Sequence, residues 1–65
     1  MKYKIIIWQY KAQVDSYESN DIKEILEYYN EKWRYVYEDL GGCYFDIFKD
    51  NKELSYNEKD KLGFY

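Results

Sequence analysis

The sequence predicts a small α+β domain with a three-stranded sheet of antiparallel type, one main helix and a short C-terminal helix, in the order β-α-β-β. Three observations support this class: a β-branched and aromatic opening segment, a following segment with helical periodicity, and two aromatic segments separated by a double glycine. The chain of 65 residues is expected to form a single domain over residues 1–65. A domain of this size hides only roughly 60% of the surface that its unfolded chain exposes.

Residues 2–10, KYKIIIWQY, have the composition of a strand, because isoleucine and aromatic residues dominate between flanking lysines. Apolar side chains alternate between its two faces, with Tyr3, Ile5 and Ile7 on one and Ile6, Trp8 and Tyr10 on the other. This pattern predicts a central strand, or one that is covered on both sides. Residues 11–20, KAQVDSYESN, are polar and show no sustained period, so we expect a loop there.

A helix is predicted to begin at Asp21, whose carboxylate can accept hydrogen bonds from the first backbone N–H groups. Glu24 stands three residues further on, as in a capping box. The apolar residues at helical spacing are Ile22, Ile25, Leu26 and Tyr29. The helix is therefore expected to bury one face against the sheet.

Two interpretations of the end of this helix remain open. In one, the helix continues through Trp33 and Leu40 and is closed by Gly41. In the favoured one, it ends near Asn30 and residues 33–38, WRYVYE, form a strand, because Trp, Tyr and Val suit strands better than helices. Glu38 and Asp39 would also lie at the wrong end of a helix dipole.

A hairpin follows from the favoured interpretation, with its turn at residues 39–42 and residues 33–38 paired with residues 43–48. Its two faces differ, because side chains alternate along each strand. One face would carry Val36, Cys43, Phe45 and Ile47. The other would carry Trp33, Tyr35, Tyr37, Tyr44 and Phe48 around Asp46, and the sequence leaves open which face is buried.

The C-terminal part is predicted to contain a polar turn at residues 49–54 and a short helix from Ser55 to Leu62. Ser55 and Glu58 have the spacing of a capping box, and Gly63 is a suitable terminating residue. The last residues, Phe64 and Tyr65, are expected to fold back onto the domain. In an alternative, residues 49–52 form a hairpin turn and residues 53–57 a further strand.

The opening Tyr-Lys strand, a helix ending near NEKWRYV and a closing YFDIFKD strand resemble a family of small bacterial and phage proteins of unassigned function. In that family the helix is commonly followed by a Gly-Trp-x-Leu-Val segment. Trp33 and Val36 match this segment, whereas Lys32 stands in place of its glycine and Tyr35 in place of its leucine. The resemblance covers residues 2–50 and implies the β-α-β-β fold without implying an activity.

Composition argues against catalysis and against cofactors. The chain has no histidine and one cysteine, Cys43, so it lacks a Ser-His or Cys-His pair, an internal disulfide and the usual ligands of zinc. Gly41 and Gly42 do not form a phosphate loop, which needs further glycines and a Lys-Ser or Lys-Thr pair. We therefore expect a protein that is not an enzyme and that holds neither a metal nor a cofactor.

Charge and hydropathy narrow the choice of partner. A net charge of −3 argues against direct binding of nucleic acid, which needs a concentrated positive field. The longest apolar run, Ile5–Trp8, is far too short to span a membrane, and the amino terminus does not resemble a signal peptide. We therefore expect a cytoplasmic protein, in the host cytoplasm if it is encoded by a phage.

Aromatic content suggests the function. Ten tyrosines are hard to satisfy inside so small a domain, because each buried hydroxyl needs a hydrogen-bond partner. Tyr and Trp are enriched at protein interfaces, so we expect a protein-binding module, such as a phage-encoded inhibitor of a host or defence protein, whose partner has a basic surface. Alternatives are a homodimer or larger structural assembly and an aromatic site for a nucleotide-type ligand. The predicted partner-binding residues are Trp33, Tyr35, Tyr37, Glu38, Asp39, Tyr44, Asp46 and Phe48.

Overall fold

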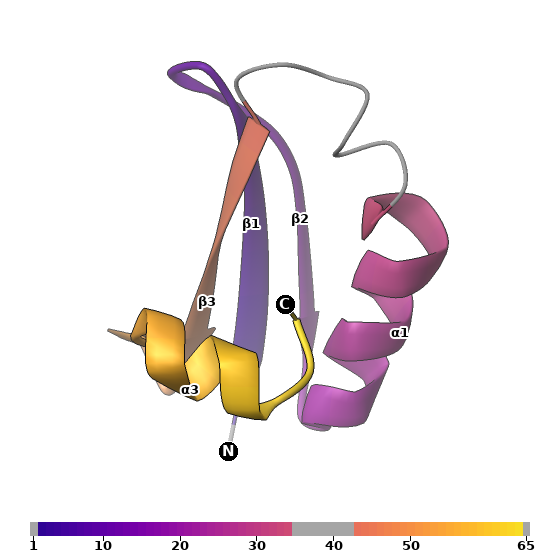
Figure 1. The fold of residues 1–65 in the computed structure, drawn as a ribbon, viewed down its shortest axis with the longest axis vertical. Coiled ribbons are helices and arrows are strands. Elements are labelled where there is room, and N and C mark those ends of the chain that lie inside the picture. Colours follow the sequence, from indigo (N-terminus) through magenta and orange to yellow (C-terminus); the bar gives the residue numbers. More distant parts are fainter. Residues whose placement is uncertain (1, 35–42, 65) are drawn as a thin grey trace.

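The computed structural model describes residues 2–34 and 43–64. Its elements, in chain order, are β1 (Tyr3–Gln9), β2 (Ala12–Ser19), α1 (Ile22–Lys32), β3 (Cys43–Lys49), β4 (Lys52–Glu53) and α3 (Tyr56–Lys61). The strands form one antiparallel sheet in the order β2-β1-β3-β4 (Figure 1). The predicted α+β class, its main helix and its short C-terminal helix are confirmed, and the described residues form a sheet of four strands instead of three.

β1 is central, as predicted, because β2 and β3 pair with its two edges. Side chains alternate along β1 between a buried face and a partly exposed face. Ile5 and Ile7 point toward the helices and are fully buried, whereas Ile6 and Trp8 on the opposite face are only half-buried. The predicted division of the β1 side chains between two faces is confirmed, but the structure covers only one of these faces with described helices.

The predicted loop at residues 11–20 is wrong, since residues 12–19 form β2. A two-residue turn at Tyr10 and Lys11 joins β1 to β2, and Tyr10 adopts a positive φ of 57°. Such turns usually contain glycine or asparagine, so the sequence carries no conventional hairpin signal here. Asp15, Tyr17 and Ser19 alternate toward α1, and polar residues at two of these three positions hide the strand periodicity.

α1 begins where it was predicted to begin. The Asp21 carboxylate accepts from the Lys23 backbone N–H at 2.9 Å, which confirms the N-cap. The capping box is not formed, because the Asp21 backbone N–H donates to the Ser19 hydroxyl at 3.1 Å and Glu24 accepts a hydrogen bond from that same hydroxyl.

The helix ends at Lys32, two residues beyond the favoured prediction. Trp33 is its C-cap and donates its backbone N–H to the Tyr29 carbonyl at 2.8 Å. A strand that begins at Trp33 is therefore wrong. The alternative of one continuous helix is interrupted at Trp33, and its continuation over residues 35–40 lies outside the described residues.

The predicted hairpin between residues 33–38 and 43–48 is wrong where it can be checked. Phe48 pairs with Lys4 of β1 and with Glu53 of β4, and not with Trp33. Residues 35–42, which include the predicted turn and most of the predicted partner strand, lie outside the described residues. The faces of β3 are nevertheless divided as predicted, with Phe45 and Ile47 buried on the side of the helices.

The C-terminal prediction is largely confirmed. Ser55 and Glu58 form the capping box of α3, and Gly63 follows the helix with a φ of 97°. Phe64 folds back into the core and is 2% exposed, whereas Tyr65 lies outside the described residues. The hairpin between β3 and β4 turns at residues 50–51, both with positive φ, so the predicted polar turn includes a short strand.

One core lies between the sheet and the two helices. Its buried members are Ile5, Ile7, Ile25, Tyr29, Phe45, Ile47, Leu54 and Phe64. Arg34 joins the end of α1 to the C-terminus, since its Nη2 donates to the Gly63 carbonyl at 2.8 Å. Lys59 of α3 is also buried, with its ammonium 5.2 Å from the centre of the Phe45 ring. The helices thus cover a single face of the sheet.

A pair of identical substitutions on neighbouring residues of β1 tests this one-sided burial. Ile5→Val should lower the free energy of unfolding by about 1 kcal/mol, because it leaves a small cavity in a closed core. Ile6→Val, on the opposite face, should cost less than about 0.5 kcal/mol. Urea denaturation of dilute protein measures both, and equal losses would contradict the one-sided core.

Candidate functional site

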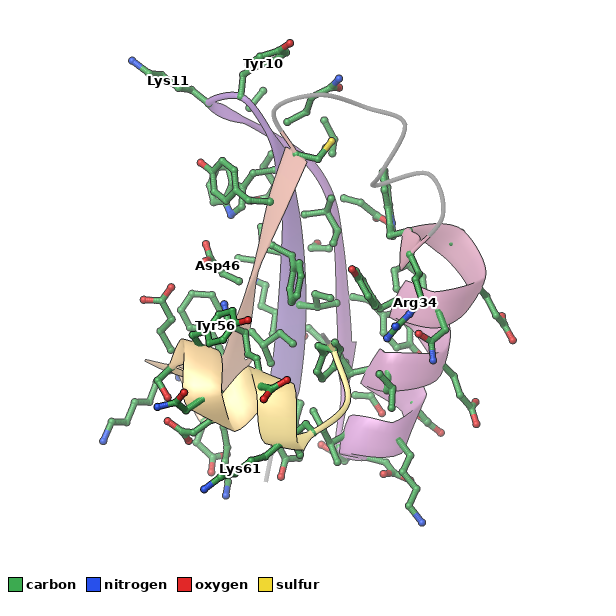
Figure 2. All side chains as sticks on the ribbon, in the orientation of Figure 1. Tyr10, Lys11, Arg34, Asp46, Tyr56 and Lys61 are labelled. Atoms are coloured by element: carbon green, nitrogen blue, oxygen red, sulfur yellow. The ribbon has the colours of Figure 1, made fainter. Side chains whose placement is uncertain are left out.

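The candidate site is the face of the sheet that points away from α1 and α3, here called the open face. It is formed by Ser16 and Glu18 of β2, Lys4, Ile6 and Trp8 of β1, Tyr44, Asp46 and Phe48 of β3, and Glu53 of β4. Asp46 lies on the side of the sheet opposite Arg34, which is next to α1 (Figure 2). In the described ranges, 2–34 and 43–64, no helix packs on this face.

The register between β1 and β3 arranges the open face in three rows. Trp8 is beside Tyr44, Ile6 is beside Asp46, and Lys4 is beside Phe48. Successive side chains on one face of a strand are two residues apart, so the rows follow one another at roughly 7 Å. An apolar strip of rings and one isoleucine therefore runs along both central strands, with one carboxylate and one ammonium group within it.

The row of rings is fixed by two contacts. The Trp8 indole N–H donates to the Asp46 carboxylate at 3.0 Å, across the two strands. The Trp8 and Tyr44 rings are stacked, with centroids 6.1 Å apart and an angle of 13° between their planes. Because the indole has its polar partner within the domain, its ring surface is available for apolar contact. Tyr44 is 44% exposed, so this row is open to solvent.

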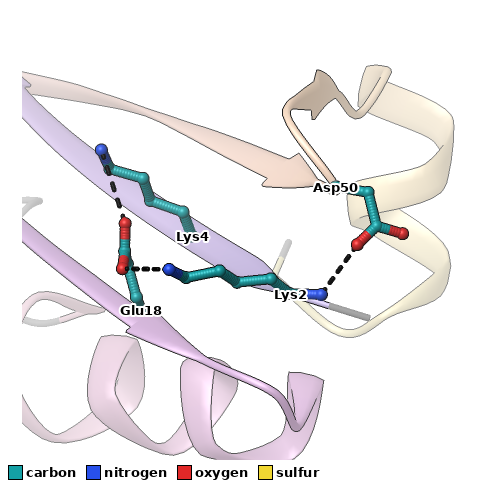
Figure 3. Close-up of polar contacts among 4 residues, drawn as sticks. All are labelled: Lys2, Lys4, Glu18 and Asp50. Carbon is teal, nitrogen blue, oxygen red and sulfur yellow. Dashed lines mark hydrogen bonds and ion pairs between the residues drawn. The ribbon is translucent and has the colours of Figure 1, made fainter.

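The other end of the open face is polar (Figure 3). Glu18 accepts ion pairs from Lys2 at 3.0 Å and from Lys4 at 3.8 Å. Hydrogen bonding and the charge of Lys2, with a further contribution from Lys4, hold the pKa of Glu18 below its ordinary value. The Lys2 backbone N–H donates to Asp50 at 2.8 Å and closes this end of the sheet.

Two shallow hollows adjoin the polar end. One, of about 260 Å³, is lined by Lys2, Lys4, Glu18, Phe48, Asp50 and Asn51. The other, of about 180 Å³, is lined by Lys4, Ile6, Phe48 and Asn51. Both are smaller than the roughly 300–1,000 Å³ typical of pockets for small ligands. The open face is therefore a largely flat surface and not an enclosed ligand pocket.

The structure brings together three of the predicted partner-binding residues, Tyr44, Asp46 and Phe48. Trp33 is not with them, because it ends α1 and packs against the core on the opposite side of the sheet. The other four, Tyr35, Tyr37, Glu38 and Asp39, lie outside the described residues. Asp46 is also placed as predicted, between the rings of its own face.

Trp33 belongs to a hydrogen-bonded cluster between α1 and β2. Its indole N–H donates to the Asp15 carboxylate at 2.8 Å, and the Tyr28 hydroxyl donates to the same carboxylate oxygen. The Tyr28 ring stacks on Tyr17 with centroids 4.4 Å apart, and the Lys32 ammonium lies 5.2 Å from the centre of the Tyr28 ring. The cluster attaches the C-terminal turn of α1 to β2, which is a structural task.

The charges of this cluster follow from its hydrogen bonds. Burial alone would raise the pKa of Asp15, but the hydrogen bonds from Tyr28, Trp33 and the Ser16 backbone outweigh it, and the pKa is lowered. Burial, with the hydrogen bond to Asp15 and its negative charge, raises the pKa of Tyr28 to about 12. The cluster is therefore held as a carboxylate bound to a neutral phenol.

Sequence reasoning missed Ile6 and Trp8 as members of the site. Alternation along residues 2–10 had placed them on one face, so the signal was present. What the sequence did not give was the pairing of β1 with β3, which puts Trp8 beside Tyr44 and Asp46. Asp15 was missed as well, because it lies in a segment that was expected to be a loop.

The chemistry of the remaining described residues is modest. In residues 2–34 and 43–64 no group of three or more potential metal ligands comes together, and Cys43 is a free, half-buried thiol. Neither α1 nor α3 has the length and apolar character that a membrane-crossing helix needs. The arrangement thus offers contact area, fixed rings and a few charges.

Comparisons of the chain with protein-family models, with curated proteins and with solved structures found no significant match. The resemblance to small bacterial and phage proteins therefore stays a prediction.

The Asp15 cluster predicts a specific alkaline loss of stability. Because the pKa of Tyr28 is raised from 10.0 to about 12, its contribution is fully present below pH 10 and is lost as the pH rises to about 12. Tyr28→Phe lacks the ionisable hydroxyl. The unfolding free energy of the wild type should therefore fall toward that of Tyr28→Phe as the pH rises from 10 to about 12. Urea denaturation at a series of pH values measures the difference, and parallel curves for the two proteins would contradict the assignment.

Proposed function

We propose that this protein is a non-enzymatic protein-binding module and that the open face is its contact surface. The observation that carries the proposal is the strip formed by Ile6, Trp8, Tyr44 and Phe48, which lies on a face that no described helix covers. Tryptophan and tyrosine are over-represented among the residues that dominate binding energy at interfaces.

Energetics favour a partner on this strip. Burial of apolar surface is worth about 25 cal/mol per Å², so rings left half-exposed represent unused binding energy. The Trp8 ring is already fixed by Asp46 and by stacking on Tyr44, so little side-chain entropy would be lost when a partner covers it. A preorganised aromatic strip of this kind supports binding of a complementary protein surface.

The nucleotide-type alternative has less support. A phosphate would need free positive charge near the rings, and Lys2 and Lys4, which lie on this face, are both paired with Glu18. The hollows beside Phe48 are also shallow. Inhibition of a host or defence protein is one form that the proposed function could take, and it stays a prediction.

The charged residues of the open face indicate which surface charge a partner would carry. The acidic rim expected from Glu38 and Asp39 lies outside the described residues. On the described part of the open face, Glu18 and Asp46 are accompanied by Lys2 and Lys4. A partner with mixed charges fits these residues better than a uniformly basic one.

The double variant Trp8→Ala and Tyr44→Ala tests the proposal. It removes the row of rings, so capture of binding proteins from a bacterial lysate by the immobilised chain should fall roughly tenfold or more. Leu62→Ala is the matched control, since it removes an exposed apolar side chain from the end of α3 and should leave capture unchanged. Circular dichroism verifies the fold of each variant, and undiminished capture by a folded double variant would refute the proposal.

A further inference from the structure

We infer that the partner of the open face presents an arginine side chain to the Asp46 carboxylate. The inference rests on the proposed function, because it names the chemistry of the partner that binds this same surface. Asp46 occupies the middle of the three rows, between the row of Trp8 and the row of Lys4. A protein that covers the apolar strip therefore also covers this carboxylate.

The Asp46 carboxylate has one hydrogen-bond partner in the described part of the chain, the indole N–H of Trp8. This group donates to Oδ2 at 3.0 Å, whereas Oδ1 has neither a hydrogen bond nor an ion pair with a described residue. A carboxylate can accept about four hydrogen bonds, so most of this capacity is left over. Because Asp46 is only half-buried, a group on a partner can use it.

Within the described residues, no lysine or arginine forms an ion pair with Asp46. All ten basic side chains belong to these residues, because the rest of the chain contains neither lysine nor arginine. The two lysines on the open face, Lys2 and Lys4, both pair with Glu18. The single arginine of the chain, Arg34, lies on the opposite side of the sheet (Figure 2). A side-chain cation for Asp46 must therefore come from another molecule.

Charge complementarity requires a cation on the partner at this point. A partner removes water from the surface that it covers, and a carboxylate that loses water without gaining an opposite charge weakens the complex. A cation opposite Asp46 offsets this loss and makes binding specific. Glu53, which is exposed beside Phe48, likewise has no ion pair with a described residue. The unpaired charges of the described open face are thus both negative, and they favour a cationic group at its centre.

The rings beside Asp46 favour a guanidinium group over other cations. Trp8 is bound to Asp46 and stacks on Tyr44 with an angle of 13° between the ring planes. A guanidinium group is planar, so it can stack on an aromatic ring while it donates to a carboxylate, whereas a lysine ammonium is compact and strongly hydrated. A divalent metal ion needs several ligands, and no group of three or more potential ligands comes together in the described chain. The partner that fits is therefore a protein surface with a central arginine.

Neutralising Asp46 tests the inference through the sign of its effect. Asp46→Asn keeps an acceptor for the Trp8 indole and removes the charge. If the partner supplies an arginine, capture of bacterial proteins by the immobilised chain should fall roughly tenfold or more, because the arginine loses its charged acceptor. If the partner is uncharged at this point, capture should instead rise, because a carboxylate no longer has to lose its water. Asp60→Asn, which removes the same charge from an exposed position on α3, is the matched control and should leave capture unchanged.

A small probe tests the same contact without a protein partner. Heteronuclear NMR of the full chain reports on both indole N–H groups, that of Trp8 bound to Asp46 and that of Trp33 bound to Asp15. N-acetyl-arginine amide should shift the Trp8 signal in a saturable way and leave the Trp33 signal in place. The uncharged isostere N-acetyl-citrulline amide should shift neither signal, and Asp46→Asn should abolish the response of Trp8.

Capture by Asp46→Asn that equals or exceeds that of the wild type overturns the inference. A Trp8 signal that does not distinguish the arginine probe from the citrulline probe also overturns it. If Asp46→Asn retains capture while the double variant Trp8→Ala and Tyr44→Ala loses it, the inference fails and the proposed function stands. If both Asp46→Asn and the double variant retain capture, both fail.

Discussion

The structure depends on one geometric constraint: the sheet has two faces, and both described helices lie on the same one. Side chains alternate along every strand, so each apolar residue that points away from the helices lacks cover within the described part of the chain. Ile5 and Ile7 are buried in the core beneath α1 and the C-terminal segment. Ile6 and Trp8, their neighbours in sequence, point to the opposite face. A core that is closed on one side and an apolar strip on the other are two consequences of the same arrangement.

Both tryptophans use the same local chemistry for different purposes. Each indole N–H donates to an aspartate on another element, Trp8 to Asp46 and Trp33 to Asp15. On the helical side, this bond fastens the end of α1 to β2, and neighbouring tyrosines complete the contact. On the open face, it holds a ring in place without covering it. The first cluster contributes to stability, and the second fixes a partly exposed ring on the face that we propose as a contact surface.

Much of the fold was predictable because its signals are local. The cap at Asp21, the capping box at Ser55 and the positive φ of Gly63 follow from residue type and spacing alone. β2 was not predictable for two reasons. Its turn uses Tyr10 and Lys11, which are not typical hairpin residues. Asp15 faces α1, and an aspartate at such a position suggests a loop unless its hydrogen-bond donors, Tyr28 and Trp33, are known. The alternation of side chains along β3 predicted which of its residues belong to the candidate site. That Trp8 lies beside them depends on the pairing of β1 with β3, which is a long-range contact that alternation does not predict.

The central claim is that the strip around Trp8 is a surface for contact with protein. The most direct measurement is quenching of Trp8 fluorescence by acrylamide in a Trp33→Phe variant, which leaves one indole in the chain. The account predicts that quenching of Trp8 decreases when the proteins captured by the chain are added, and that Tyr44→Ala weakens this decrease. Quenching of Trp8 that is unchanged by the captured proteins would contradict the account.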